Sequence, residues 1–385
     1  MRVLALVFED VFHTGGGMGV HARDLYREVG RLGHQVVIVS LASVPPAYGT
    51  FPLSPNVEVL KIEQKLTFVS DIALLQQFLF EQNFLMNALE HYGREQFDII
   101  HIHDSHLWSC AEALRLLWKI PVVMTCHLSP LLHEMRFSRE ALATYKNQVE
   151  GTALCNADAL ISVSQYYHDA LRNSLVGAES TVIHNGIDTD ALAGCHRDDA
   201  VRAQHGVRGG RRLIAMVARP VSYKGVEAFV EAARRFPDDQ FVFVGYLPPT
   251  VEKHYPLARD LVQAEHDLPN FKWERDLPHD DKFRLMASAD IGAVLSTIEP
   301  FGICALEWMA LRVPLITTAV GGLSEFCAGS NCDIVGTSAE AFVSCLASHR
   351  RSSERLIRAR HTAERFTWAE AARKTVEVYK EVITR

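Results

Sequence analysis

Two glutamates, Glu299 and Glu307, stand on either side of a loop that leads into a helix. Apolar residues 291–295 predict a strand before this loop, and Gly302 begins a helix-forming run after it. The first N–H groups of a helix lack backbone acceptors and carry the positive end of its dipole, so an anion can bind there. Carboxylates beside that anion can accept hydrogen bonds from hydroxyl groups. A phosphate between two groups that bind hydroxyls is typical of a site for a sugar nucleotide.

Two cations follow an earlier strand of the same half of the chain. Residues 212–218 predict a buried strand, and Arg219 and Lys224 lie in the loop between it and the next helix. Two positive charges at the end of a strand match the charge of a diphosphate leaving group. The alternative is a charged turn that is merely exposed to solvent.

A cluster of glycines at residues 15–17 and 19 follows the first predicted strand, residues 2–8, with Glu9 and Asp10 in between. Glycines at such a turn allow the backbone to approach a phosphate closely. A dinucleotide-binding site is the obvious competitor, but the spacing does not give Gly-x-Gly-x-x-Gly. A dehydrogenase would also have no use for the pair of glutamates in the second half.

Three histidines, His101, His103 and His106, lie at or just after the predicted strand 97–103 and raise the hypothesis of a metal site. In a strand, residues two apart share one face. However, no carboxylate or cysteine is fixed beside them by a helix. We therefore expect no metal ligands in the chain, and we expect His103 and Asp104 to line a ligand site instead.

His127 stands at the carboxyl end of another predicted strand, residues 121–127. In open parallel sheets, ligands bind beyond the carboxyl ends of the strands. A histidine in this position can also be purely structural, but its placement favours a functional role.

The length of 385 residues exceeds that of one usual domain, so two domains of similar size are expected. A hydrophobic content of 48% is enough to fill two cores. The composition becomes polar and weakly patterned after residue 190, which places the interdomain linker in 184–200.

The net charge of −7 argues against nucleic acid or an anionic membrane as the main partner. Eight cysteines at irregular spacings, without a Cys-x-x-Cys pair, favour free thiols in a reducing cytoplasm. The apolar N-terminus predicts a first strand rather than a signal peptide, and no apolar run reaches the length of a membrane span. We therefore expect a cytoplasmic protein without integral membrane contact.

The stretch Glu-Pro-Phe-Gly-Ile-Cys-Ala-Leu-Glu at residues 299–307 resembles the nucleotide-sugar site of family-four retaining glycosyltransferases of GT-B fold. The Arg…Lys-Gly run at 219–225 and the Gly-Gly-x-x-Glu at 321–325 match the same family. Glu9 and His127, with the segment that follows His127, are most similar to glycogen- and starch-synthase-like members.

The resemblance implies an α/β protein of GT-B fold, with two Rossmann-like parallel-sheet domains facing a deep interdomain cleft. An acceptor-binding domain is expected at 1–188 and a nucleotide-sugar-binding domain at 189–366. A C-terminal helix, about 367–385, is expected to pack back on the first domain. The pattern near the C-terminus predicts final helices at about 338–350 and 352–384.

The resemblance also implies roles for individual residues. The catalytic residues would be His127, Arg219, Lys224 and Glu299. The donor-binding residues would be Gly16, Gly17, Arg219, Lys224, Arg275, Glu299, Phe301, Gly302, Ile303, Cys304 and Glu307. The acceptor-binding residues would be Glu9, Asp10, His103 and Asp104. Arg275 replaces a glycine that is usual in the family, which leaves the identity of the donor base open.

The expected activity is transfer of a hexose, glucose or a related sugar, from a nucleotide diphosphate sugar to a hydroxyl of a small molecule or glycan. The resemblance implies retention of anomeric configuration, no metal and no other cofactor, with UDP-sugar favoured over ADP- or GDP-sugar. The alternatives are a sugar-nucleotide epimerase of GT-B fold and an α-glucan synthase. The sequence leaves open whether the protein forms a homodimer.

Overall fold

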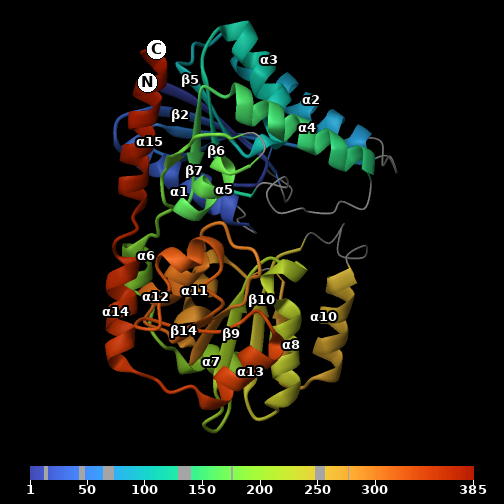
Figure 1. Cartoon of the computed structure of the whole chain (residues 1–385), viewed down its shortest axis with the longest axis vertical. Coiled ribbons are helices and arrows are strands. Elements are labelled where there is room, and N and C mark those ends of the chain that lie inside the picture. The colour runs from blue at the N-terminus through green and yellow to red at the C-terminus, as the bar shows by residue number, and fades with distance from the viewer. Residues whose placement is uncertain are drawn as a thin grey trace. The chain divides into compact units, whose positions relative to one another are not determined.

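The computed structural model describes residues 1–12, 16–42, 48–63, 73–128, 140–174, 177–247, 256–275 and 277–385 (Figure 1). The chain divides into two compact units. Unit 1 comprises Met1–Gly186 together with Trp368–Arg385, and unit 2 comprises Ile187–Thr367.

The core of unit 1 is an eight-stranded sheet in the order β3-β4-β2-β1-β5-β6-β7-β8. Its strands are β1 (Arg2–Val7), β2 (Gln35–Leu41), β3 (Gly49–Ser54), β4 (Val57–Ile62), β5 (Ile99–His103), β6 (Val122–Cys126), β7 (Ala159–Ser162) and β8 (Thr181–Val182). All neighbouring strands pair in parallel except β3, which forms an antiparallel hairpin with β4 at the edge. The near-continuous apolar runs of β1, β2, β5 and β6 are those expected for parallel strands covered on both faces.

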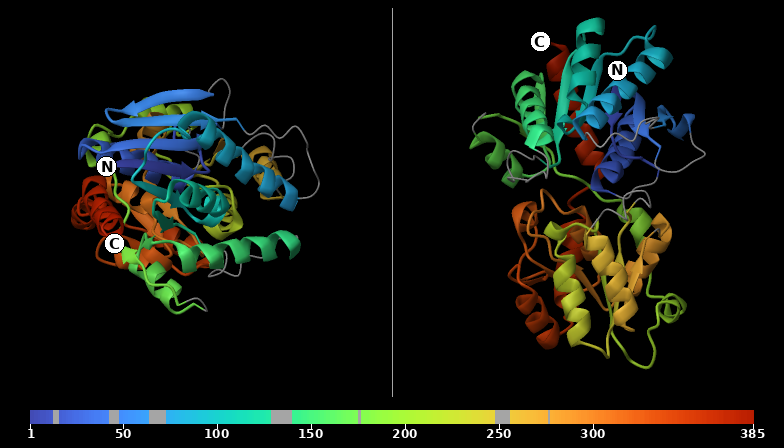
Figure 2. Two further views of the ribbon diagram at one scale, coloured as in Figure 1. Left: turned by 90° about the horizontal axis from the view of Figure 1, so that it is seen from above. Right: turned by 90° about the vertical axis from the view of Figure 1, so that its right-hand side faces the viewer.

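Helices cover both faces of this sheet (Figure 1 and Figure 2). They are α1 (Gly17–Arg31), α2 (Ala73–Tyr92), α3 (Trp108–Trp118), α4 (Glu140–Asn156), α5 (Gln165–Arg172) and α15 (Trp368–Ile383), with a 3₁₀ turn η1 (Ser105–Leu107). On one face, α2, α3 and α4 lie together and pack apolar residues such as Phe84 and Trp108 on the strands. On the other face, α1 packs beside the C-terminal helix α15.

The core of unit 2 is a six-stranded, fully parallel sheet in the order β11-β10-β9-β12-β13-β14. Its strands are β9 (Leu213–Val217), β10 (Gln240–Val244), β11 (Phe271–Glu274), β12 (Ile291–Val294), β13 (Leu315–Thr317) and β14 (Asp333–Ile334). Numbered within the unit, this order is 3-2-1-4-5-6, the order of a doubly wound nucleotide-binding sheet. The predicted parallel sheet is confirmed.

Helices flank the second sheet on both faces as well (Figure 1). They are α6 (Thr189–Ala193), α7 (Asp199–Gln204), α8 (Val226–Arg235), α10 (Pro256–Asp267), α11 (His279–Ser288), α12 (Ile303–Ala310), α13 (Ala339–Ser348) and α14 (Ser353–Ala363), with 3₁₀ turns η2 (Ser222–Lys224) and η3 (Gly321–Glu325). The aromatic rings of Phe229, Phe241 and Phe342 join α8 and α13 to the sheet. Among the described helices, none combines the length and apolar character that a membrane span requires.

The predicted helix 352–384 is wrong, because the chain breaks between α14 and α15. Phe366 packs its ring against Phe301 and Phe326, and its carbonyl accepts a hydrogen bond from the Ile187 N–H. Thr367 then forms a parallel bridge with Ile187. A periodic pattern cannot reveal this break, because the partners of Phe366 are far away in the sequence.

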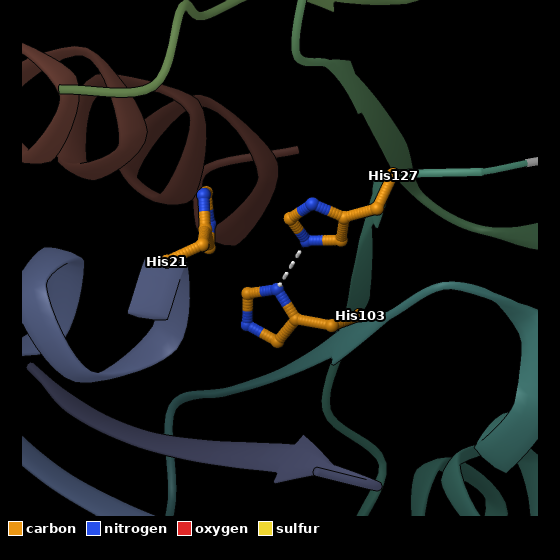
Figure 3. A group of neighbouring side chains, drawn as sticks. All are labelled: His21, His103 and His127. Carbon is orange, nitrogen blue, oxygen red and sulfur yellow. Dashed lines mark hydrogen bonds between the residues drawn. The ribbon is translucent and has the colours of Figure 1, made fainter. Parts of the chain in front are cut away.

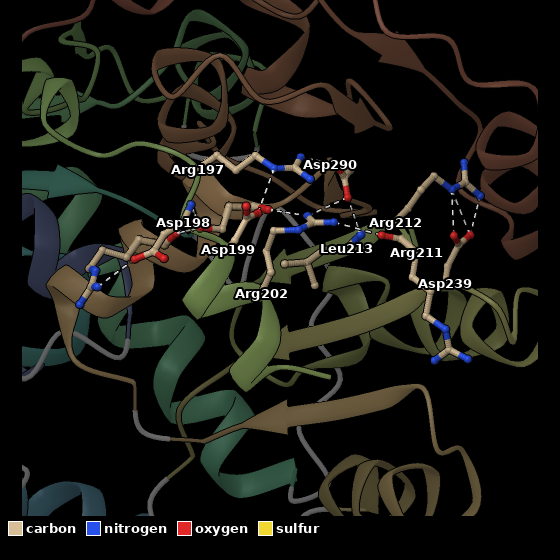
Figure 4. A network of polar contacts seen from close by, with 11 residues as sticks. Arg197, Asp198, Asp199, Arg202, Arg211, Arg212, Leu213, Asp239 and Asp290 are labelled. Carbon is tan, nitrogen blue, oxygen red and sulfur yellow. Dashed lines mark hydrogen bonds and ion pairs between the residues drawn. The ribbon is translucent and has the colours of Figure 1, made fainter. Parts of the chain in front are cut away.

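A network of polar contacts joins the first segment of unit 2 to its sheet (Figure 4). Arg202 is buried and donates hydrogen bonds to Asp290 Oδ2 at 2.8 Å, to the Ser288 carbonyl at 2.8 Å and to the Arg211 carbonyl at 3.0 Å. The Asp290 carboxylate also accepts from Arg197 and from the Leu213 N–H, both at 2.7 Å. Burial alone would raise the pKa of Asp290, but these hydrogen bonds outweigh it and hold the pKa below its usual value. The start of β9 is therefore tied to the polar segment that precedes it.

We expect Arg202→Ala to reduce the free energy of unfolding by about 2–3 kcal/mol, because it breaks a largely buried ion pair and leaves two carbonyls without their donor. The expected loss is smaller than is usual for breaking a buried ion pair, because Asp290 keeps two other hydrogen-bond donors. Urea denaturation followed by circular dichroism measures the change. Arg373, which forms only exposed ion pairs on α15, provides the matched control Arg373→Ala. Equal losses in the two variants would contradict the importance of the network.

Candidate active site

The order of the strands in unit 2 reverses between β9 and β12, so the loops that follow these two strands lie side by side. Gly225, in the loop after β9, has φ 75° and packs directly on the Leu295 carbonyl. Any Cβ at this position would clash with that carbonyl. The glycine thus allows the loop of Arg219 and Lys224 to press against the loop of Glu299.

The side chains of Lys224 and Glu299 meet at this point. Lys224 Nζ lies 2.7 Å from Glu299 Oε2, and both side chains are mostly buried. Ser296 Oγ donates to the same carboxylate oxygen at 2.9 Å. Two residues that the sequence predicted separately are therefore direct partners, and together they place a cation and an acid at the strand ends.

The start of α12 lies in the same loop. Gly302 has φ 106°, a left-handed conformation that favours glycine, and a Cβ there would clash with Leu323. Gly322 packs on the Pro300 carbonyl and donates its N–H to the Glu299 carbonyl at 2.9 Å. The first N–H groups of α12, at Ile303 and Cys304, lack intrahelical acceptors. The turn at residues 321–325 thus fixes a helix N-terminus that can bind an anion.

Arg219 has an exposed hydrogen bond from its guanidinium to the Tyr223 hydroxyl at 2.7 Å. The Tyr223 carbonyl in turn accepts from the Thr297 N–H at 2.7 Å, which joins the two loops a second time. Both predicted cations therefore lie on the loop after β9 at the reversal of the sheet.

Glu307 is buried in α12 and forms an ion pair with Lys282, whose Nζ lies 3.1 Å from Oε1 and 3.3 Å from Oε2. The sequence predicted a glutamate that accepts hydrogen bonds from hydroxyls, but it gave no signal for this lysine of α11. A ligand hydroxyl that binds Glu307 would therefore share the carboxylate with an ammonium group.

Several side chains predicted at the donor site have partners within the protein. Phe301 is buried against Phe326, and Cys304 donates a hydrogen bond to the Val217 carbonyl. Burial raises the pKa of the Cys304 thiol, which stays neutral. Arg275 lies over the Trp273 ring and pairs with Glu265 at 3.1 Å. The side chains of Phe301 and Cys304 are thus engaged within the protein, and their predicted roles in donor binding stay predictions.

Unit 1 has its own reversal of strand order, between β1 and β5. After β1, the Glu9 carboxylate accepts a hydrogen bond from the Gly19 N–H at 2.8 Å, in the first turn of α1. Gly16, the residue before α1, lies so close to this carboxylate that a Cβ would clash with it, whereas a Cβ at Gly17 would meet open space. Glu9 thus occupies part of the helix N-terminus that the sequence predicted for a phosphate.

Asp10 is buried and pairs with Lys61 of β4, with Nζ 2.8 Å from Oδ2. Asp104, directly after β5, has φ 58° and accepts the N–H groups of His127 at 2.5 Å and Leu128 at 3.2 Å. Burial raises the pKa of Asp104 to about 8, against the opposing effect of these hydrogen bonds. Both acids thus shape the strand ends, and their predicted roles in acceptor binding stay predictions.

The histidines are grouped differently from the cluster considered in the sequence. His101 is held by the Tyr379 hydroxyl at 2.5 Å and by Thr125 Oγ1 at 2.8 Å, and the ring of His106 packs on Phe8. His103 instead meets His127, with Nδ1 and Nε2 3.0 Å apart.

The third ring beside this pair comes from α1. His21 contacts both His103 and His127, at ring-centroid distances of 5.1 Å and 4.5 Å (Figure 3). A histidine on a helix gives no sequence signal that it faces two strand ends.

Comparisons with known proteins cover both units. Residues 15–191 match the family model described as Glycosyltransferase Family 4, and residues 197–347 match Glycosyl transferases group 1. Alpha-maltose-1-phosphate synthase of Mycolicibacterium smegmatis is 28% identical over 99% of this chain and 100% of its own length. Glycogen synthase of Mycobacterium tuberculosis is 28% identical over 98% of this chain and 94% of its own length.

Solved structures share the fold. Sucrose-phosphate synthase from Thermosynechococcus elongatus superposes with a TM-score of 0.82 at 21% identity, covering 100% of this chain and 99% of that one. Anabaena HepE in complex with UDP-glucose superposes with a TM-score of 0.73 at 18% identity, covering 99% and 100%. The predicted α/β fold of two GT-B parallel-sheet domains is confirmed.

The buried histidines of unit 1 predict a dependence of stability on pH. Burial lowers the pKa of His21 to about 4 and that of His101 to about 3 from the usual 6.5. Below about pH 6.5 these histidines therefore bind protons in the unfolded chain but stay neutral in the folded protein. The stabilisation is complete above pH 6.5 and is lost as the pH falls, through about pH 4 for His21 and about pH 3 for His101.

We expect the free energy of unfolding to fall by about 1.4 kcal/mol per pH unit for each such histidine between pH 6.5 and 4.5. Urea denaturation at a series of pH values measures this slope. His101→Gln should make the slope shallower, whereas Leu117→Ala, which alters an exposed side chain that does not titrate, should leave it unchanged. A slope that is the same in all three proteins would contradict the assignment.

Proposed function

Because the chain belongs to the family-four glycosyltransferases of GT-B fold, we propose that it is a retaining, metal-independent hexosyltransferase that uses a nucleotide diphosphate sugar. The observation that carries this proposal is the meeting of Lys224 and Glu299 at 2.7 Å beside the N-terminus of α12. A cation, unpaired N–H groups and a carboxylate at one point are suited to a ligand that carries both phosphates and hydroxyls.

The diphosphate of the donor would lie against the first N–H groups of α12, with Arg219 and Lys224 as its cations. Glu299 would accept hydrogen bonds from the sugar, and Glu307 from the ribose. Lys224 then has to exchange part of its contact with Glu299 for the phosphate. Before the donor binds, the contact with Lys224 keeps the Glu299 carboxylate oriented for the sugar hydroxyls.

UDP-glucose is the proposed donor. One solved structure of the same fold is a complex with UDP-glucose, and another, a starch synthase from Arabidopsis thaliana, is bound to ADP. The base-binding segment around β11 carries Arg275, which is held over Trp273 by Glu265. These contacts of Arg275 do not select between bases, so the preference for UDP over ADP or GDP is proposed from the sequence resemblance alone.

In the proposed reaction the acceptor hydroxyl attacks the anomeric carbon from the face that the diphosphate leaves. The bond from that carbon to the phosphate oxygen breaks, and the leaving oxygen takes the proton of the acceptor. The new glycosidic bond therefore keeps the anomeric configuration of the donor. The cations stabilise negative charge as it moves onto the leaving oxygen, and His127 would face the reacting sugar.

The acceptor is proposed to be a small sugar or polyol, phosphorylated or not. Proteins similar to this chain over most of its length are named for phosphorylated products, such as alpha-maltose-1-phosphate, and also for glycogen. Two acidic side chains near the strand ends of unit 1 are engaged in internal contacts, because Asp10 pairs with Lys61 and Asp104 accepts hydrogen bonds from backbone N–H groups. They leave neutral histidines and glycines to meet the acceptor, which suits hydroxyl groups.

The test is a screen of nucleotide sugars with hexoses, hexose phosphates and short α-glucans, with the product anomer identified by NMR. We expect transfer with UDP-glucose, retention of configuration and full activity in EDTA. Restoration of a lost activity by magnesium or manganese would contradict metal independence. Release of an epimerised sugar nucleotide without any acceptor would instead identify an epimerase.

Replacement of Lys224 separates catalysis from binding. Charge on the leaving oxygen grows in the transition state, so a cation directed at it contributes more there than in the substrate complex. We expect Lys224→Ala to lower kcat/KM by roughly ten- to more than a hundredfold, the equivalent of about 1.5–3 kcal/mol, with part of the loss in kcat. Lys224→Arg should recover part of the activity.

Steady-state kinetics at saturating donor measures the two constants. Arg373, which lies in exposed ion pairs on α15, provides the control Arg373→Ala, which should leave both unchanged. A raised KM with kcat intact in folded Lys224→Ala would make Lys224 a binding residue only.

A further inference from the structure

Three imidazole rings converge in unit 1 from three separate elements (Figure 3). His21 comes from α1, His103 from the end of β5, and His127 directly follows β6. One ring nitrogen from each histidine lies within 4.8 Å of the other two. His21 and His103 are buried, and His127 is partly exposed, so the group is reachable from one side.

The hydrogen bond made by His21 Nδ1 determines whether His21 Nε2 carries a proton. Nδ1 lies 2.7 Å from the side-chain oxygen of Asn185, which can only accept a hydrogen bond. Nδ1 therefore carries the proton, and Nε2 presents a lone pair. This buried Nε2 has no hydrogen-bond partner among the residues that the structure describes. A buried acceptor without a donor is costly for a protein unless a ligand uses it.

The other two rings also present nitrogens toward the same point. His103 Nδ1 and His127 Nε2 are 3.0 Å apart, with one proton between them. The second nitrogen of His103, Nε2, lies 2.8 Å from the Tyr26 hydroxyl. If the proton between the two rings moves from His103 Nδ1 to His103 Nε2, this N–H can donate a hydrogen bond to the Tyr26 oxygen. His103 Nδ1 and His127 Nε2 then both present lone pairs that can bind a cation.

Charge does not oppose such a cation. Burial lowers the pKa of all three histidines, so the rings are neutral at pH 7 and need not lose a proton to the solvent. Histidine ligands in metal sites commonly bond their second nitrogen to a carbonyl, carboxylate or other polar group, which orients the ring. Asn185 and Tyr26 provide this support for His21 and His103.

We propose that His21, His103 and His127 bind a divalent transition-metal ion of the zinc class, and that the bound ion inhibits transfer. Zinc binds imidazole nitrogens at about 2.0–2.1 Å and commonly uses three histidines and a water. In a tetrahedron of that size the nitrogens lie about 3.3 Å apart. The His103–His127 pair at 3.0 Å already approaches this spacing, whereas the three ligand nitrogens together lie within 4.8 Å, so His21 has to move closer to complete the site. Magnesium and calcium prefer oxygen ligands and do not suit the site.

Inhibition rests on the proposed function, in which His127 faces the reacting sugar. A metal ion on His127 Nε2 replaces the contact of this nitrogen with His103 and places a positive charge where an oxocarbenium-like sugar develops. The proposed transfer therefore needs no metal, and zinc bound at His127 would inhibit it.

Binding can be tested without any substrate. The protein, freed of metal with EDTA and dialysed, is titrated with Co²⁺ by absorbance and with Zn²⁺ by calorimetry. We expect one ion per chain and a visible Co²⁺ spectrum typical of nitrogen ligands. His21→Leu should weaken binding at least about tenfold, and Asn185→Ala about 10- to 100-fold. Circular dichroism and thermal melting check that each variant is folded.

His101→Gln is the matched control, because it removes a neighbouring buried histidine whose two nitrogens are already occupied. It should bind Co²⁺ as the unaltered protein does. Unchanged binding in His21→Leu, a thiolate charge-transfer band, or the absence of stoichiometric binding would overturn the site.

Activity is then assayed with zinc added, each variant being compared with its own zinc-free rate. Zinc should inhibit the unaltered protein and His101→Gln, and EDTA should reverse the inhibition, while His21→Leu should resist it. Stoichiometric binding without inhibition would refute the inhibitory role. A protein that binds the ion but transfers no sugar would contradict the proposed function and leave the metal site standing.

Discussion

Each sheet of this protein reverses its strand order once, and the reversal decides where chemistry can occur. At the reversal, neighbouring parallel strands send their chains to opposite faces, so no helix covers the gap at their carboxyl ends. In unit 2 this point lies between β9 and β12 and brings Lys224 to Glu299. In unit 1 it lies between β1 and β5, which carry Glu9 and Asp104 just beyond their ends. In both units, the positions of the side chains at the strand ends therefore depend on the reversal of strand order.

Much of the fold and part of the candidate site could be predicted from the sequence, because local patterns carry them. Apolar runs bounded by glycine locate the parallel strands, and the glycines at 225 and 302 mark turns with positive φ. Lys224 and Glu299 could each be selected, because each lies in the loop region after a predicted strand. Their contact follows only from the order of the strands, which no local pattern contains.

The remaining features arise from packing between distant segments. Lys282 reaches Glu307 because α11 lies beside α12, and His21 reaches His127 because α1 crosses the strand ends. The break before α15 depends on the rings around Phe366. None of these contacts is encoded by spacing, since a side chain on a helix gives no sign of which distant partner it will meet. The sequence therefore predicts the ends of strands well and the contacts made by helices poorly.

The C-terminal helix α15 has a consequence for the order in which the protein can fold during synthesis. It supplies Tyr379, whose hydroxyl holds His101, and Trp368, whose ring lies 5.4 Å from that of His21. Unit 1 therefore lacks part of its core until residues 368–385 have left the ribosome. Unit 2 lies wholly between the two segments of unit 1 and has all its strands earlier. Although domains usually fold from the N-terminus onward as they emerge, here the second unit can be complete before the first.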